Sequence, residues 1–247
     1  MAKKAGILSG KVVLVTGAAK RLGRAIALAA ADEGADVAIT YRDSAREARA
    51  VVGELARRGV RALAVGCNVT DEISVREMVR EVANELGGID VLVNNAANYE
   101  DVEFEKLTVA QWDAIFASNA RGPFLASREA QPYLKKRRGR IVNMGSLGGL
   151  RPWATHVHYC SSKAAMHMLT KATAKALAPE IAVNAVAPGV IELGEKSAAA
   201  FMKHMAKQTP MRRNGTAADI AAAVMFFATA PSFITGQILA VDGGLGL

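Results

Sequence analysis

Strand-like and helix-like segments alternate along the whole chain, and this alternation restricts the fold more than any other feature. Residues 11–16 (KVVLVT) are a continuous run of mostly β-branched residues, which is typical of a strand buried on both faces. Residues 21–33 are alanine-rich and helical in pattern, and this segment ends before Gly34. Strands separated by helices of this length run parallel, with right-handed crossovers that place helices on both faces of the sheet.

The same alternation continues to the end of the chain. The sequence therefore predicts a single-domain, doubly wound parallel α/β sheet of about seven strands, Rossmann-like, over residues 1–247. Further strands are expected at 37–41, 61–66, 89–93, 141–144, 182–187 and 237–241, and further helices at 44–58, 71–86, 108–137, 158–178 and 217–227.

The segment 190–215 follows the pattern less well. It contains Gly194, Pro210, Gly215 and a short helical run at 198–207. Long excursions at the carboxyl edge of a parallel sheet are often lids over a ligand crevice, but a plain surface insertion has the same sequence signature. Both interpretations stay open, and we carry this segment forward as a candidate substrate lid.

The chain is basic, with a formal net charge of +8, and its densest basic run is residues 135–140 (KKRRGR). One interpretation is a nucleic-acid patch. The other is the solvated end of a helix, where cations complement the macrodipole and Gly139 ends the helix. The run is short and contains no aromatic residue, which favours the helix end. We therefore expect no nucleic-acid partner.

The cysteines and the hydropathy pattern indicate the compartment. Cys67 and Cys160 form neither a disulfide framework nor a metal-type cluster, and His156 and His158 have no supporting ligands nearby in the sequence. No stretch approaches the length of a membrane-spanning helix, and the first residues contain no apolar signal core. These features predict a cytoplasmic protein that holds no metal and does not bind membranes.

The turn after the first strand, residues 16–23 (TGAAKRLG), has the composition of a dinucleotide site. Gly17 allows a tight exit from the strand, and Gly23 allows the helix to pack close to the sheet. Free backbone N–H groups at the start of the helix can then face a pyrophosphate.

This turn resembles that of the short-chain dehydrogenase/reductase family, whose usual pattern is TGxxxGxG. Arg21 stands at the position of the middle glycine, and this TGxxxRxG variant resembles the pteridine-reductase branch of the family. The resemblance implies a Rossmann-like oxidoreductase and places the Arg21 guanidinium beside the phosphates of a cofactor or beside a flat polar substrate.

Charge near the end of the second strand favours NADP(H) over NAD(H). An NAD site needs a carboxylate there to bind the ribose 2′-hydroxyl, but the sequence has Tyr41 followed by Arg42. By resemblance, Lys20 lies where basic residues contact a 2′-phosphate, and Ser44 could add a hydroxyl. The contrary detail is Asp43, which would reach the ribose if the loop bends.

Further cofactor contacts follow from the resemblance. Asn68-Val69 falls where the family usually has Asp-Val beside the adenine, Asn95-Ala96 lies in the segment matching NNAG, and the family's later threonine is missing after Pro188-Gly189. The implied cofactor site comprises Gly17, Lys20, Arg21, Leu22, Gly23, Tyr41, Arg42, Ser44, Asn68, Val69, Asn95, Ala96, Tyr159, Lys163, Pro188, Gly189 and Ile191.

The chemical signal is Tyr159 followed four residues later by Lys163, a spacing that puts both on one helix face. A nearby ammonium lowers the pKa of a phenol, so we expect Tyr159 to exchange a proton with an alkoxide near neutral pH. Ser146, thirteen residues before Tyr159, could hydrogen-bond the substrate oxygen. By resemblance, these residues and Asn119 form the catalytic set. Pro123 cannot donate to the Asn119 carbonyl, which is thereby left to hold a water.

Substrate identity is the least determined property. By position, the substrate site comprises Tyr99, Leu147, Trp153 and Glu192. Tyr99 and Arg21 are compatible with a dihydropterin, whereas Ser146 favours an ordinary carbonyl or 3-oxoacyl substrate, because pteridine reductases typically carry an aspartate there. A non-catalytic NADP(H)-binding regulator is a further alternative.

The resemblance also bears on assembly. Relatives pair through the helices that hold Asn119 and Tyr159, which implies a homotetramer or homodimer.

Overall fold

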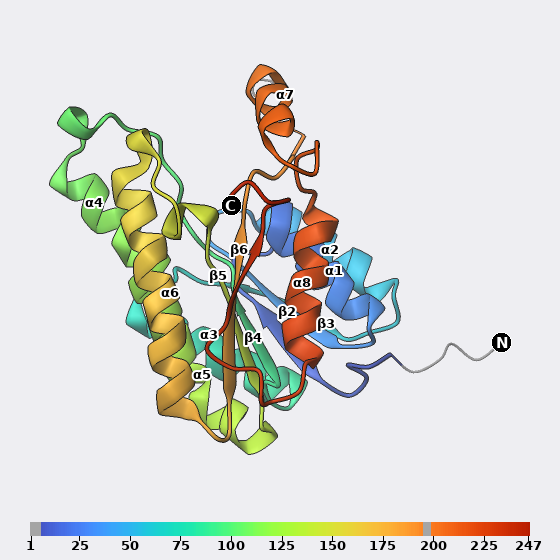
Figure 1. The fold of residues 1–247 in the computed structure, drawn as a ribbon. Coiled ribbons are helices and arrows are strands. Elements are labelled where there is room, and N and C mark those ends of the chain that lie inside the picture. Colours follow the sequence, from blue (N-terminus) through green and yellow to red (C-terminus); the bar gives the residue numbers. More distant parts are fainter. Residues whose placement is uncertain (1–5, 195–198) are drawn as a thin grey trace.

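The computed structural model describes residues 6–194 and 199–247. It contains a seven-stranded parallel sheet with the strand order β3-β2-β1-β4-β5-β6-β7 (Figure 1). The sheet agrees with the predicted fold in strand number, direction and sequence positions. The strands are β1 (Val12–Val15), β2 (Asp36–Tyr41), β3 (Ala62–Gly66), β4 (Val91–Asn94), β5 (Arg140–Met144), β6 (Ala182–Pro188) and β7 (Ile238–Val241).

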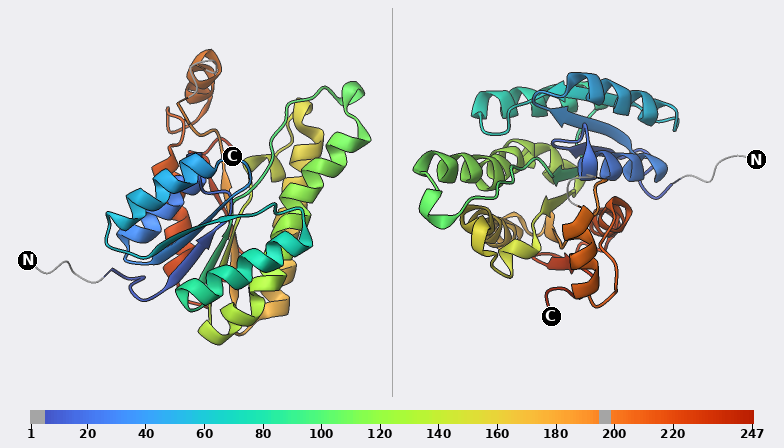
Figure 2. Two further views of the ribbon diagram at one scale, coloured as in Figure 1. Left: turned by 180° about the vertical axis from the view of Figure 1, so that it is seen from behind. Right: turned by 90° about the horizontal axis from the view of Figure 1, so that it is seen from above.

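Helices cover both faces of the sheet. Figure 2 shows α1, α2 and α8 on one side and α3, α5 and α6 on the other, as expected of a doubly wound fold. Their bounds agree with the predicted helices to within a few residues. The helices are α1 (Arg21–Asp32), α2 (Ala45–Ala56), α3 (Glu72–Leu86), α4 (Val109–Phe116), α5 (Gly122–Arg137), α6 (Val157–Leu177), α7 (Ala199–Gln208) and α8 (Ala217–Thr229).

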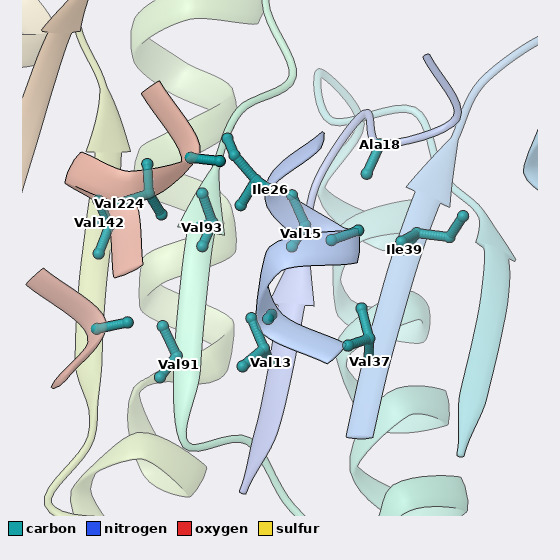
Figure 3. Close-up of a cluster of buried hydrophobic side chains, with 14 of the residues drawn as sticks. Val13, Val15, Ala18, Ile26, Val37, Ile39, Val91, Val93, Val142 and Val224 are labelled. Atoms are coloured by element: carbon teal, nitrogen blue, oxygen red, sulfur yellow. The ribbon is translucent and has the colours of Figure 1, made fainter. Parts of the chain in front are cut away.

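Successive residues of the central strand face opposite layers, and this alternation builds two cores. Val13 and Val15 pack beneath α1 and α8, in the cluster that Figure 3 shows with Ile26. Leu14 points the other way and packs with the residues of α3 and α5. Burying one such side chain stabilises the fold by roughly 1.5–3 kcal/mol, so the apolar central strand anchors both layers.

The strand order reverses direction beside β1. From β1 the chain moves outward to β2 and β3, then crosses to the other side to form β4. In register, Val13 pairs with Val37 of β2 and with Val91 of β4. The chain therefore leaves β1 and β4 toward opposite sides at the carboxyl edge, and it is at such a reversal that open α/β sheets bind ligands in a crevice.

The region predicted as one long helix, residues 108–137, is divided into α4 and α5 by a π-helical stretch, η2 (Ala117–Arg121). Pro123 lies directly after this stretch and has no N–H to donate. The irregular turn contains Asn119, and such π-bulges are frequent at functional sites. The helical region is thus interrupted next to the proline, at the turn that holds Asn119.

The segment 190–215 contains the predicted short helix, α7, and residues 195–198 of it lie outside the described residues. An isolated bridge between Ile191 and Gly215 closes the base of the segment. None of the residues Ala199–Gln208 of α7 is buried, and in Figure 1 this helix projects beyond the carboxyl edge of the sheet. Within the described residues, no helix is both long enough and apolar enough to cross a membrane.

Candidate active site

A cleft of about 790 Å³ opens at the carboxyl edge of the sheet. It extends from the turn after β1 to Tyr159 and Lys163 on α6, and residues of α7 contribute to its wall. Motifs that lie far apart in the sequence therefore share one cavity. The predicted residues that line it are Gly17, Lys20, Arg21, Leu22, Gly23, Tyr41, Arg42, Ser44, Asn68, Val69, Asn95, Ala96, Tyr99, Ser146, Leu147, Trp153, Tyr159, Lys163, Pro188, Gly189 and Ile191.

The turn after β1 is held against the end of β4. Thr16 Oγ1 accepts hydrogen bonds from the backbone N–H groups of Asn95 and Ala96, both at 3.0 Å. Asn95 Nδ2 in turn donates to the carbonyls of Thr16 (2.8 Å) and Gly17 (3.0 Å). These reciprocal bonds fix the floor of the cleft at the point where the strand order reverses.

Two glycines in this turn are required by close approach. Gly17 has a φ of +64°, and a Cβ there would lie 2.9 Å from the Ala96 Cα. A Cβ on Gly23 would lie 2.7 Å from the Ala18 Cα. Arg21 also adopts a positive φ, of +52°, which costs a non-glycine residue about 1–2 kcal/mol. Arg21 thus lines the cleft in a strained backbone conformation.

The cations predicted to meet a 2′-phosphate are both paired with carboxylates. Lys20 Nζ lies 3.2 Å from Glu47, and Arg42 Nε donates to Asp43 at 2.7 Å. The Lys20 and Arg42 side chains are 53% and 61% exposed. Asp43, considered as a ribose ligand, is thus bound to Arg42 instead.

Asn68 lines the cleft as expected, but its amide oxygen is already engaged. It accepts from the backbone N–H of Thr70 at 3.2 Å and from the Thr70 hydroxyl at 3.0 Å. These two bonds use both lone pairs of the oxygen. If Asn68 is to accept a hydrogen bond from the amino group of an adenine, as the family resemblance implies, this turn has to rearrange.

Ser146, Tyr159 and Lys163 meet at the inner end of the cleft. The Ser146 hydroxyl lies close enough to the Tyr159 phenol to act on its pKa through hydrogen bonding. Lys163 Nζ lies 5.8 Å from the centre of the Tyr159 ring and donates to the Met144 carbonyl at 2.7 Å. The loop after β5 and the first turns of α6 thus bring together two hydroxyls and one buried ammonium.

Burial shifts the pKa values of both Tyr159 and Lys163, and the shift of Tyr159 is opposite to the one expected. Burial raises the pKa of Tyr159 to about 12, and the hydrogen bond with Ser146 opposes this in part. Burial also lowers the pKa of Lys163 to about 8. The expectation that the ammonium would lower the pKa of Tyr159 was wrong, because desolvation of the buried phenolate dominates the shift.

Asn119 is fully buried and is not part of the cleft lining that the described residues form. Its Oδ1 accepts from the backbone N–H of Asn98 at 2.8 Å, and its Nδ2 donates to the Asn98 carbonyl at 2.9 Å. Nδ2 also donates to the Ser162 hydroxyl at 3.1 Å. The side chain therefore ties the π-helical stretch to the segment after β4 and to α6.

An aromatic group lies beside Tyr159. The ring of Tyr99 meets that of Tyr159 edge to face, with 5.0 Å between centroids, and the Tyr99 hydroxyl is hydrogen-bonded to His156 Nε2. Trp153 packs edge to face on His156 at 5.7 Å. Sequence reasoning missed His156 as a cleft residue; its spacing of three residues before Tyr159, one helical turn, was the available signal.

Glu192 is the one predicted site residue, besides Asn119, that lies outside the described cleft lining. It is exposed, and its backbone N–H donates to the Gly215 carbonyl at 2.8 Å. The bridge at the base of segment 190–215 turns the side chain outward. Three apolar residues of the segment 190–215, which the sequence assigned to the site only as a whole, line the wall instead: Leu193, Phe201 and Met202.

The chain is similar to known proteins over nearly its whole length. The model of the family described as enoyl-(acyl carrier protein) reductase matches residues 17–246. A 3-oxoacyl-[acyl-carrier-protein] reductase of Staphylococcus aureus is 38% identical over 240 residues, which are 95% of this chain and 98% of that protein.

Solved structures with the same fold include two from other bacteria. A short-chain dehydrogenase of Burkholderia cenocepacia in complex with NADP is 37% identical, with a TM-score of 0.90, over 98% of this chain and 100% of its own. A short-chain dehydrogenase/reductase of Serratia marcescens is 34% identical, with a TM-score of 0.92, over 97% and 99%. The chain belongs to the short-chain dehydrogenase/reductase family and is an oxidoreductase.

Proposed function

We propose that this protein uses NADPH to reduce a small carbonyl substrate, with Tyr159 as the proton donor. The observation that carries the proposal is the inner end of the cleft, where the side chains of Ser146 and Tyr159 lie together beside the buried ammonium of Lys163. The same cleft begins at the Gly17 turn, so a dinucleotide and a small substrate fit within one cavity.

The residues present fit NADP(H) as the cofactor. Gly17 and Gly23 keep the turn after β1 free of side chains that would clash with the backbone around it, and Lys20 and Arg42 supply positive charge for a 2′-phosphate. The relative from Burkholderia cenocepacia binds NADP. The nicotinamide, when bound, supplies the hydride, while the protein orients it and handles the proton.

The protonation state of Tyr159 favours reduction. With its pKa raised to about 12, the phenol is protonated at neutral pH and can give a proton to the oxygen of a reduced carbonyl. Ser146 supplies a second hydroxyl for that oxygen. Lys163 and the Asn119 carbonyl are the groups through which Tyr159 would regain its proton from solvent.

A generic ketone or a 3-oxoacyl thioester is the substrate class we favour, because Ser146 stands at the catalytic position and a curated relative is a 3-oxoacyl-[acyl-carrier-protein] reductase. A dihydropterin is the alternative that Tyr99 and Arg21 support, since both line the cleft. A non-catalytic regulator would have no physical need for Asn119, Ser146, Tyr159 and Lys163 together.

Three further properties belong to the same proposal. The segment 190–215 would act as a lid, because Leu193, Phe201 and Met202 lie in the cleft wall. The protein would assemble as a homotetramer or homodimer through the helices that hold Asn119 and Tyr159. It would act in the cytoplasm, where Cys67 and Cys160, both free and buried, stay reduced.

The direct test is Tyr159→Phe, which removes the proton donor and keeps the ring. Loss of general acid catalysis should lower kcat by about 10²–10⁴-fold, while the Kd for NADPH changes little. NADPH absorbance follows turnover, and fluorescence titration gives the Kd. A variant with the parent's kcat would remove Tyr159 from the mechanism.

The substrate class is tested by comparing ketones, acetoacetyl-coenzyme A and dihydrobiopterin under the same NADPH assay. A ketone or the 3-oxoacyl thioester should be the substrate with the highest kcat/KM. A preference for dihydrobiopterin would favour the alternative, and no turnover of any of them would favour the regulator.

A further inference from the structure

His167 is a buried, titratable side chain that the proposed mechanism does not use. It lies on α6 one turn after Lys163, and it is 5% exposed. Its imidazole faces the loop after β5, which carries Ser146. A histidine is an unusual choice for a site with so little solvent, because its charged form is costly to bury.

The imidazole occupies a space that two glycines leave open. A Cβ built on Gly145 would overlap His167 Nε2 and would lie 2.8 Å from its Cδ2. A Cβ built on Gly149 would lie 2.7 Å from His167 Cε1. One glycine precedes Ser146 and the other follows it, so the His167 ring contacts both ends of the turn.

One polar contact connects the ring to the serine itself. The backbone N–H of Ser146 donates to His167 Nε2 at 3.4 Å. Burial, together with the positive charge of Lys163, lowers the pKa of His167 to about 4, against a smaller opposing effect from the Gly149 backbone. The ring is therefore neutral at physiological pH, and Nε2 keeps the lone pair that accepts this hydrogen bond.

The consequence concerns the Ser146 hydroxyl. Within the same turn, Ser146 Oγ accepts from the backbone N–H of Gly148 at 3.0 Å, and the hydroxyl lies close enough to Tyr159 to act on the pKa of its phenol. His167 therefore bonds to the main chain of Ser146, and Gly148 bonds to the Ser146 side chain. Displacement of a reacting group by about 1 Å can cost on the order of 100-fold in rate.

We propose that His167 is a positioning residue: it supports the turn after β5 from beneath and so sets the place of the Ser146 hydroxyl relative to Tyr159. It acts through Ser146 and does not touch the substrate. The proposal rests on the proposed role of Ser146 in carbonyl reduction, and it assigns to the turn a supporting side chain from the neighbouring helix.

The first test compares His167→Met with His167→Gln in the NADPH assay with acetoacetyl-coenzyme A. Methionine fills much of the space but accepts poorly, so kcat should fall by about 10- to 100-fold, with KM and the Kd for NADPH within about twofold. Glutamine places a carbonyl oxygen near the Nε2 position and should recover most of kcat. Met168→Leu, at the exposed next position, is the matched control and should keep the parent's kcat.

Equal kcat values for the parent and His167→Met would overturn the proposal, and so would a glutamine variant as impaired as the methionine variant. The proposed function is judged separately: Ser146→Ala and Tyr159→Phe with unchanged kcat would refute it. If these two lose activity while His167→Met does not, the positioning role alone has failed.

A second test asks whether a methyl group added at Gly145 and the His167 ring compete for the same space. It measures stability and does not depend on activity. Gly145→Ala should lower the melting temperature of the parent but should be tolerated in His167→Ala, because the next nearest atom to the new Cβ is the Val186 carbonyl oxygen at 3.3 Å. Gly149→Ala is the control and should be harmful in both backgrounds, since its Cβ would also lie 2.8 Å from the Lys163 carbonyl carbon. Equal effects of Gly145→Ala in both backgrounds would show that the ring does not support the turn.

Discussion

The two ends of the cleft are built on opposite physical principles. At the inner end, Lys163 is almost wholly buried, and so is Asn119, which lies outside the cleft lining but bonds to Asn98 in that lining; the hydrogen bonds that hold these two side chains are 2.7–3.1 Å long. At the outer end, Lys20 and Arg42 are more than half exposed and form ion pairs with carboxylates at the surface. Charges interact strongly where water is excluded and weakly where it is not. The inner end should therefore govern rate and stability, and the outer end should tune cofactor choice.

The largest effect that separates the two ends should come from Lys163→Met. The change removes the buried ammonium beneath Tyr159, so proton resupply should fail and kcat should drop by about 10²–10³-fold. Stability should not fall with it at neutral pH. The folded pKa of about 8 lies below the unfolded value, so the ammonium costs stability below pH 8, and this cost fades as the pH rises from 8 to about 10.5.

Activity and chemical denaturation should be measured side by side on Lys163→Met. The variant should unfold at a denaturant concentration no lower than the parent's at pH 7, and its stability should lack the parent's rise above pH 8. A variant that keeps full kcat, or one that loses rate merely because it unfolds, would break the distinction between the two ends.

The next effect should be structural. Asn119→Ala removes the side chain that joins the π-helical stretch to Asn98 and Ser162, and it leaves buried polar groups without partners. We expect a loss of about 2–4 kcal/mol in the free energy of unfolding. Urea denaturation measures it. Asn98→Ala is the control, because Asn98 takes part in these bonds through its backbone. An equal loss in both variants would show that the Asn119 side chain has no special role in stability.

The same contrast explains how much of the molecule was predictable. The sheet, the turn at Gly17 and the pairing of Tyr159 with Lys163 follow from local patterns: an apolar run predicts a buried strand, and a spacing of four predicts one helix face. The grouping of Ser146 with these two residues came from the family resemblance. The raised pKa of Tyr159 was not predictable, because desolvation depends on atoms from several elements.

Two contacts show why the remaining site residues escaped sequence reasoning. His167 reaches the Ser146 turn across the gap between α6 and β5, and only the packing of Gly145 and Gly149 makes room for it. Glu192 was assigned to the substrate site by its position after β6, but the bridge between Ile191 and Gly215 directs the chain so that it lies outside the cleft lining. Both outcomes depend on tertiary contacts between distant segments.

The smallest effect should appear at the outer end. Arg42→Ala removes one exposed cation from the cleft, so the Kd for NADPH should rise by about 10-fold while the Kd for NADH changes little, because NADH has no 2′-phosphate. Added salt should narrow the difference between the parent and the variant, since exposed charges are screened.

Fluorescence titrations with both cofactors at low and high salt check this prediction, and kcat with saturating NADPH should stay near the parent's value. Arg46→Ala is the matched control, because the Arg46 side chain is 90% exposed, pairs with Glu47 and is not part of the described cleft lining. Equal losses for NADPH and NADH in Arg42→Ala would mean that Arg42 does not recognise the 2′-phosphate. A large fall in kcat would mean that the two ends of the cleft are not independent.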